Sequence, residues 1–147
     1  MPTGEHDGDR REVVGAAIVD DLGRPTVLLA ARRTEPSALA GGWEFPGGKV
    51  DPGEGHAEAL RRELREELGV EVALGERLEG PLRGGWPLGS DFVIWVWWAV
   101  VVEGEPAPLE DHDQLRWLDR DGLYAVPWLP ADLPIVRAAE ARMAGPA

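Results

Sequence analysis

Three glutamates close together in the sequence, Glu63, Glu66 and Glu67, are the side chains best placed to do chemistry. Spacings of three and four put side chains on one face of a helix, so a helix here would gather the three carboxylates on an arc about 100° wide. At about 5.5 Å and an effective dielectric constant of about 20, each pair repels by about 3 kcal/mol. A divalent cation would remove this repulsion, because Mg²⁺ prefers carboxylate oxygens. The alternative is a solvated helix face, on which Arg62 and Glu66 form an ordinary ion pair.

The residues around these glutamates decide between the two alternatives. From Gly48 the sequence runs through five residues to Glu54, and through seven more to the run RELREELGV at 62–70. This 23-residue segment resembles the signature box of the Nudix hydrolase family at every fixed position. The preceding run WEFPGGKV at 43–50 resembles the MutT-like branch, whose members hydrolyse nucleoside triphosphates. The resemblance therefore favours the metal site.

The resemblance also implies a cofactor, one or more Mg²⁺ ions for which Mn²⁺ is a possible substitute. A later loop is expected to add a ligand, because the run GEP at 104–106 followed by Glu110 is similar to the corresponding MutT-like segment. Glu110 is equally compatible with an exposed loop charge. The implied metal ligands are the Gly47 carbonyl and the carboxylates of Glu63, Glu66, Glu67 and Glu110.

Four residues of the box are implied to be catalytic. Glu63 or Glu66 would accept a proton from water, and the sequence leaves this choice open. Arg62 would orient a box carboxylate, and Glu54 would hold the glycine-rich loop against the helix. The expected reaction converts a (deoxy)nucleoside triphosphate to the monophosphate and pyrophosphate. A Nudix-fold module that only binds a nucleotide is the alternative, although such a module would be expected to have lost box carboxylates.

A further set of residues is expected to bind the nucleotide: Arg33, Phe45, Gly48, Lys49, Trp128 and Asp132. Arg33 aligns with a phosphate-contacting position of the MutT-like branch, and its alternative is a surface arginine. The segment at 128–132 resembles the one that this branch places against the base. Trp128 would either stack on the base or fill the core. Asp132 would read the base, cap the last helix, or do both.

The identity of Asp132 predicts which base is preferred. An ionised carboxylate only accepts hydrogen bonds, so Asp132 would pair with the amino group of cytosine and repel the carbonyl of guanine. CTP, dCTP and 5-methyl-dCTP are therefore the expected substrates. The alternative is an 8-oxo-dGTP diphosphatase.

Strands mixed with two helices must position these residues, which implies an α/β fold. The resemblance specifies a Nudix-type α/β/α sandwich with a mixed β-sheet between helices. The long helix is predicted at 56–68, with Gly69 as its C-terminal cap. Its predicted buried stripe consists of Ala57, Leu60, Leu64 and Leu68. The other predicted elements are strands at 12–19, 26–31, 70–79, 92–102 and 114–118, a hairpin turn at 20–25, a loop at 81–90 and a second helix at 131–143.

The composition limits the partners and the location of the protein. Its 147 residues carry 27 Asp and Glu against 15 Lys and Arg, a net charge of −12, which disfavours long nucleic acids and anionic membranes as partners. A small-molecule nucleotide is the expected partner, bound by a monomer or homodimer. We expect a flexible tail at 1–10 and a single domain at 11–147. The absence of Cys and of a basic, then apolar, leader favours a cytoplasmic location.

The longest apolar run, at 92–102, has 11 residues, fewer than the ~20 that a membrane-spanning helix needs. It is apolar at both alternating sets of positions, which predicts a central strand buried on both faces. The alternative is that some of its tryptophans form a base-stacking wall.

Overall fold

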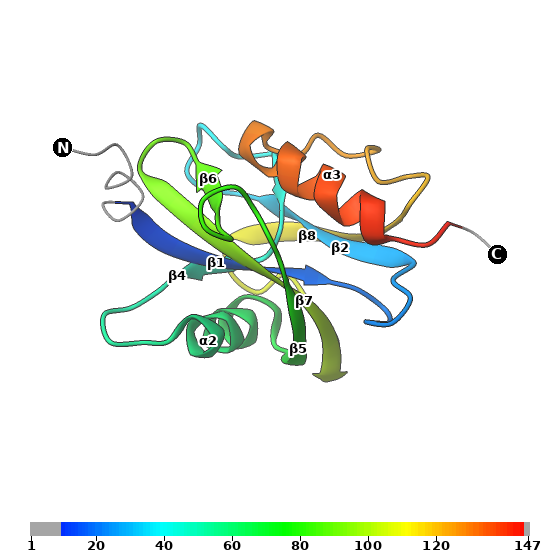
Figure 1. Ribbon diagram of the computed structural model, residues 1–147, viewed down its shortest axis with the longest axis horizontal. Coiled ribbons are helices and arrows are strands. Elements are labelled where there is room, and N and C mark those ends of the chain that lie inside the picture. Colours follow the sequence, from blue (N-terminus) through cyan, green and yellow to red (C-terminus); the bar gives the residue numbers. More distant parts are fainter. Residues whose placement is uncertain (1–9, 146–147) are drawn as a thin grey trace.

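The computed structural model describes residues 10–145, in which two β-sheets are packed with helices (Figure 1). The larger sheet consists of β1 (Arg11–Ile18), β4 (Gly47–Lys49), β5 (Glu71–Leu78), β6 (Trp86–Leu88) and β7 (Phe92–Glu103). Its strand order is β4-β1-β7-β5, and β6 also pairs with β7. Strands β1 and β7 are parallel and the other pairs are antiparallel, so the sheet is mixed. The predicted tail at 1–10 lies, except for Arg10, outside the described residues.

The smaller sheet is antiparallel and consists of β2 (Val27–Arg33), β3 (Trp43–Glu44) and β8 (His112–Asp119). The predicted hairpin between 12–19 and 26–31 is therefore wrong, since β1 and β2 belong to different sheets and meet only at the isolated bridge between Val19 and Leu28. Both edges of β1 are already paired, with β4 and with β7. The turn is closed instead by a carboxylate oxygen of Asp20, which accepts the backbone N–H of Thr26 at 2.8 Å.

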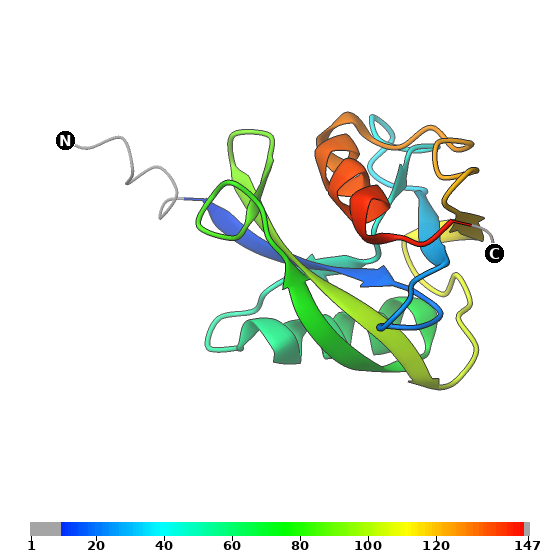
Figure 2. The same ribbon diagram turned by 45° about the vertical axis from the view of Figure 1, so that its right-hand side comes forward.

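Two helices complete the layers, α2 (His56–Leu68) and α3 (Leu133–Arg142), the latter preceded by the 3₁₀ turn η1 (Pro130–Asp132). Helix α2 lies on one side of the larger sheet, and α3 lies on the other side with the smaller sheet (Figure 2). The predicted range of α2 is confirmed. It ends at Gly69, whose left-handed φ of 71° lets its N–H bond to the Arg65 carbonyl. The α/β sandwich is likewise confirmed.

Two details of the packing correct the sequence prediction. Ala57 lies in the first turn of α2 and is only half-buried, whereas Ala59 is fully buried. The predicted loop at 81–90 contains β6, because Trp86 pairs with Ile94 on β7. The Trp86 indole N–H also donates to the Leu78 carbonyl at 2.8 Å, which fixes this segment to the sheet.

Strand β7 is the centre of the molecule, as its apolar pattern predicts. Ile94, Val96 and Trp98 belong to the core between the larger sheet, the smaller sheet and α3. Trp95 and Trp97 pack against the second core, beneath α2. The strand is thus covered on both faces, and its tryptophans pack within the protein.

Candidate active site

A cavity of about 950 Å³ brings most of the predicted site residues together. Its walls come from β1, from the β3–β4 segment, from α2, from the start of β7 and from the loop that enters η1. The predicted site residues among its lining are Arg33, Phe45, Gly47, Gly48, Lys49, Glu63, Glu67 and Asp132. The other predicted residues, Glu54, Arg62, Glu66, Glu110 and Trp128, lie outside the lining.

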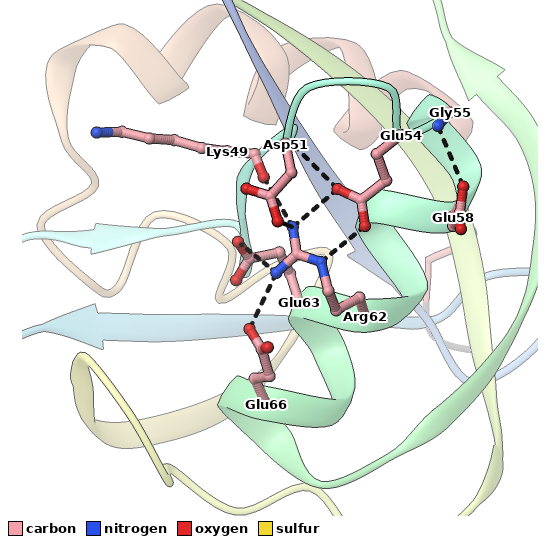
Figure 3. Close-up of polar contacts among 8 residues, drawn as sticks. All are labelled: Lys49, Asp51, Glu54, Gly55, Glu58, Arg62, Glu63 and Glu66. Atoms are coloured by element: carbon pink, nitrogen blue, oxygen red, sulfur yellow. Dashed lines mark hydrogen bonds and ion pairs between the residues drawn. The ribbon is translucent and has the colours of Figure 1, made fainter.

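Arg62, in the middle of α2, is the centre of an ion-pair network (Figure 3). Its Nε and Nη2 atoms donate to the two carboxylate oxygens of Glu54 at 2.7 and 3.0 Å. Nη2 also donates to the Lys49 carbonyl at 3.1 Å, and Nη1 to Glu66 Oε1 at 3.0 Å. The paired guanidinium lowers the pKa of Glu54 to about 2. These contacts tie the glycine-rich loop to the helix, the arrangement expected for Glu54.

Glu67 is buried in the cavity wall, and no Lys, Arg or His among the described residues forms an ion pair with it. Glu67 is only 6% exposed, and its Oε1 accepts a hydrogen bond from the backbone N–H of Gly47 at 3.1 Å. Burial raises the pKa of Glu67 to about 9, and the nearby carboxylate of Glu63 adds to this rise. The charged form is therefore unstable here until a positive charge arrives.

Glu63 is the second cavity-lining carboxylate of α2. Burial raises its pKa, and Arg62 opposes this rise because its Nη1 lies 3.4 Å from Glu63 Oε2. The Glu63 carboxyl group also explains Gly48, since a Cβ at that position would lie only 2.3 Å from it. A side chain at 48 would therefore displace Glu63 from the cavity.

These residues fit a divalent cation by their chemistry. The cavity-lining carboxyl groups of Glu63 and Glu67 have raised pKa values, and a divalent cation would displace their protons and bind the anionic oxygens that hard cations prefer. Glu66 lies apart from them, 48% exposed at its side chain and bonded to Arg62. Within the part of the chain that the structure describes, no three His, Asp or Glu side chains are grouped closely enough to form a complete metal cluster. Water and substrate oxygens would have to complete the coordination, as is usual for Mg²⁺.

The loop before β8 contributes a different acid from the one predicted. Glu110 and Asp111 are both exposed, but only Asp111 lines the cavity, where it adds to the raised pKa of Glu67. Asp111 has a left-handed φ of 62°, which turns the chain at this point. The resemblance of the segment at 104–110 to a MutT-like segment predicted Glu110 as a metal ligand, with an exposed loop charge as the alternative, and did not point to the adjacent Asp111.

The far wall of the cavity contains Asp132 and Phe45. Asp132 is only 4% exposed, and burial raises its pKa well above 3.8, with the charge of Glu44 adding to the rise. Asp132 sits at the N-cap position of α3, yet within residues 10–145 its side chain makes no capping hydrogen bond. Trp128 fills the core, 5.3 Å from the Phe45 ring between centroids, and donates its indole N–H to the Leu123 carbonyl at 2.7 Å. The structure thus places Asp132 against the cavity and Trp128 behind it.

Two cationic side chains line the cavity. Arg33 donates from Nη1 to both oxygens of Glu44, at 3.1 and 3.2 Å, and from Nε to the Glu35 carbonyl at 2.6 Å. Lys49 points away from Arg62 (Figure 3), and its Nζ lies 5.9 Å from the centre of the Phe92 ring. Arg33 and Lys49 are the positive charges of a largely apolar wall whose other charged residues are acidic.

Comparison with known proteins identifies the family. The family model for the NUDIX domain matches residues 9–139. The chain belongs to the Nudix family. As a Nudix hydrolase it acts on phosphoanhydride bonds, and enzymes of this family generally use divalent metal ions.

None of the helices within residues 10–145 is long and apolar enough to cross a membrane.

Several relatives of this Nudix hydrolase align over most of its length. A protein of Mycobacterium tuberculosis (strain CDC 1551 / Oshkosh) with the name "Putative 8-oxo-dGTP diphosphatase 2" is 41% identical over 123 residues, 82% of this chain and 81% of the relative. The CTP pyrophosphohydrolase of Escherichia coli (strain K12) is 39% identical over 127 residues, 86% and 89% of the two chains. The solution structure of the E. coli ORF135 protein matches with a TM-score of 0.72 and 34% identity, covering 96% of this chain and 94% of that one.

Proposed function

We propose that this Nudix hydrolase is a Mg²⁺-dependent pyrophosphohydrolase that converts a nucleoside triphosphate to the monophosphate and pyrophosphate. The observation that carries the proposal is the composition of the cavity wall, with the half-buried Glu63 and the buried Glu67 in one part and Asp132 beside Phe45 in another. The first part suits a polyphosphate with its cation, and the second suits a base. The cavity volume of about 950 Å³ is ample for a nucleotide.

Each side chain then has a part in the reaction. Water attacks one of the two phosphorus atoms that share the α–β bridging oxygen, the bond from that phosphorus to the bridging oxygen breaks, and the monophosphate and pyrophosphate separate. Mg²⁺, held by Glu67, Glu63 and the Gly47 carbonyl, would neutralise the phosphates and lower the pKa of water. Glu63 accepts the proton of the attacking water, because it lines the cavity with a raised pKa, whereas Glu66 is exposed and bonded to Arg62.

Charge balance supports the same assignment. A triphosphate is strongly anionic and the protein carries a net charge of −12, so the two must be brought together by local cations. Arg33 and Lys49 line the cavity and would bind phosphate oxygens that the metal leaves free. Arg62 takes no direct part, because its guanidinium is used by Glu54, Glu66 and the Lys49 carbonyl.

Cytosine is the base we propose as preferred. The amino group at C4 of cytosine can donate a hydrogen bond to the Asp132 carboxylate. The E. coli relative at 39% identity has the name CTP pyrophosphohydrolase. Such a hydrogen bond contributes on the order of 1–3 kcal/mol when its loss would leave a buried group unpaired. The expected substrates are CTP, dCTP and 5-methyl-dCTP.

An 8-oxo-dGTP diphosphatase is the second candidate, and the burial of Asp132 favours it. The raised pKa keeps this side chain protonated at higher pH than usual, and a neutral carboxylic acid donates as well as accepts. It can therefore donate to the guanine carbonyl that an ionised aspartate would repel. The name of the M. tuberculosis relative at 41% identity agrees with this candidate.

The test is a comparison of kcat/KM for dCTP, 5-methyl-dCTP and 8-oxo-dGTP, with Mg²⁺, in the wild type and in Asp132→Asn. The proposal expects pyrophosphate release, dCTP or 5-methyl-dCTP as the best substrate, and a variant that loses this preference. A wild type that favours 8-oxo-dGTP tenfold over dCTP would establish the second candidate. Release of no pyrophosphate from any nucleoside triphosphate would contradict both.

A further inference from the structure

His112 is the most deeply buried ionisable side chain that the mechanism above leaves unused. Its side chain has 0% exposure, and its Nε2 lies 2.9 Å from Glu44 Oε2. Glu44 in turn accepts two contacts from Arg33 Nη1. The three residues come from the three strands of the smaller sheet, with His112 opposite Arg33 on β8 and β2, and Glu44 opposite Ala31 on β3. They form a continuous chain from the protein interior to the cavity wall.

The direction of the hydrogen bonds in this chain follows from the chemistry of its members. A carboxylate only accepts and a guanidinium only donates, so Nε2 of His112 must carry the hydrogen shared with Glu44. The other ring nitrogen, Nδ1, is buried and has no hydrogen-bond partner within residues 10–145. The neutral ring with its proton on Nε2 satisfies this site best, because it leaves no donor unpaired.

These hydrogen bonds hold the Arg33 guanidinium in one position at the cavity wall. Arg33 Nε is bound by the Glu35 carbonyl and Nη1 by Glu44, while Nη2 has no partner among the described residues. Without Glu44 the arginine would keep a single anchor near the cavity. Glu44 could itself rotate, since its only donors among residues 10–145 are Arg33 and His112.

We propose that His112 is a positioning residue for substrate binding, which holds Glu44 so that Glu44 presents Arg33 Nη2 to a phosphate group of the substrate. This inference rests on the proposed nucleoside triphosphate substrate for the identity of the anion. A preorganised guanidinium binds a phosphate oxygen with less loss of side-chain freedom than a mobile one, so the contribution falls on binding. His112 touches no substrate.

The first experiment separates KM from kcat, with whichever of dCTP and 8-oxo-dGTP the wild type hydrolyses faster. His112→Leu keeps an apolar side chain in the buried site but removes the donor, and should raise KM about fivefold to tenfold with kcat within about twofold. His112→Gln retains an N–H donor at the position of Nε2 and should restore most of the loss. Unchanged KM in His112→Leu, or a fall confined to kcat, would overturn the proposal.

A double-mutant cycle with Glu44→Gln tests the route of the effect. If His112 acts through Glu44, adding His112→Leu to Glu44→Gln should raise KM no further. Additive effects would overturn the proposal, because His112 would then act through the adjacent Glu110–Asp111 loop.

The matched control is His56→Leu, since His56 also lies 2.9 Å from a glutamate, Glu12, but outside the cavity lining. Its KM should stay at the wild-type value.

The second experiment needs no substrate and so separates this proposal from the proposed function. Hydrogen exchange of the Arg33 Nη1–H groups, followed by NMR of the ¹⁵N-labelled protein, reports how firmly Glu44 holds the guanidinium. Exchange should be faster in Glu44→Gln and in His112→Leu, and close to wild type in His112→Gln. Equal exchange in the wild type and Glu44→Gln would overturn the proposal even if His112→Leu failed to fold. A wild type that hydrolyses no nucleotide would leave this result intact and refute only the proposed function.

Discussion

The Glu54 carboxylate receives two hydrogen bonds from the Arg62 guanidinium, whereas the Glu67 carboxyl group is buried near a second carboxylate and, among residues 10–145, receives only the Gly47 N–H. Both belong to the same 23-residue box. Their pKa values move in opposite directions, to about 2 for Glu54 and to about 9 for Glu67. The same side-chain type is therefore stabilised as an anion in one place and destabilised as an anion in the other.

The difference in pKa distinguishes the box residues that hold the fold together from those that are available to a ligand. Glu54 and Arg62 satisfy each other and hold the loop to the helix, so nothing remains for a ligand to contact. The carboxyl group of Glu67, with a pKa of about 9, is held protonated at neutral pH, and its ionisation beside Glu63 at the cavity wall costs free energy unless a cation binds. Perturbed carboxylates in a cavity are typical of a functional site.

The largest expected effect is the loss of activity when the carboxyl group of Glu67 is replaced. Glu67→Gln keeps the volume of the side chain but removes the charge, so kcat/KM should fall by roughly 10² or more. Without divalent cation its melting temperature at pH 7 should rise, because the wild-type carboxyl group must take up a proton on folding, whereas glutamine is neutral already. Pyrophosphate release and thermal melts in EDTA measure the two effects.

The control is Glu58→Gln on the same helix. Glu58 accepts the Gly55 N–H at the start of α2, a contact that glutamine can also make, and it lies outside the cavity lining. Its activity should match the wild type. Near-wild-type turnover in Glu67→Gln would refute the distinction between the two groups of carboxylates.

A smaller effect on stability is expected from Asp132. Its pKa is raised above 3.8 in the folded state, so the native protein holds this proton more tightly than the unfolded chain. The stabilisation is complete below the unfolded pKa and is lost as pH rises through the folded one. Asp132→Asn should therefore exceed the wild type in stability at pH 8, and by less at about pH 4. Urea melts at both pH values provide the measurement, and a difference that does not widen with pH would contradict the burial of the charge.

The smallest expected effect, and one of opposite sign, comes from Glu54. Its folded pKa of about 2 lies below the ordinary 4.5, so its stabilising contribution is present above pH 4.5 and lost as pH falls towards 2. Glu54→Gln should melt a few degrees lower than the wild type at pH 7. Melts repeated at decreasing pH should show the two proteins converging below about pH 4.5. A constant gap would mean that the ion pair with Arg62 contributes little.

Local features of the site were accessible from the sequence. Helix α2 follows from its apolar periodicity and from Gly69, and the glycine-rich loop with Glu54 and Arg62 follows from the box spacing. The two partners lie only eight residues apart. Contacts between residues this close in the sequence can be predicted without knowledge of the tertiary fold.

Contacts across the fold were beyond the sequence argument. The choice of Asp111 over Glu110 depends on a left-handed backbone turn, and the core position of Trp128 depends on packing against Phe45. The hairpin prediction failed because the partners of β1, the strands β4 and β7, lie far along the chain. Neither Glu44 nor His112 carried a sequence signal, since their pairing joins two strands 68 residues apart.

Binding of Mn²⁺, measured by EPR titration without substrate, tests most directly whether the unpaired carboxylates hold the cation. The wild type and Glu54→Gln should both bind Mn²⁺, because Glu54 is already satisfied by Arg62. Glu67→Gln should bind at least tenfold more weakly, since it loses an anionic oxygen ligand. Equal affinity in Glu67→Gln and the wild type, or a loss confined to Glu54→Gln, would place the cation elsewhere and contradict the account.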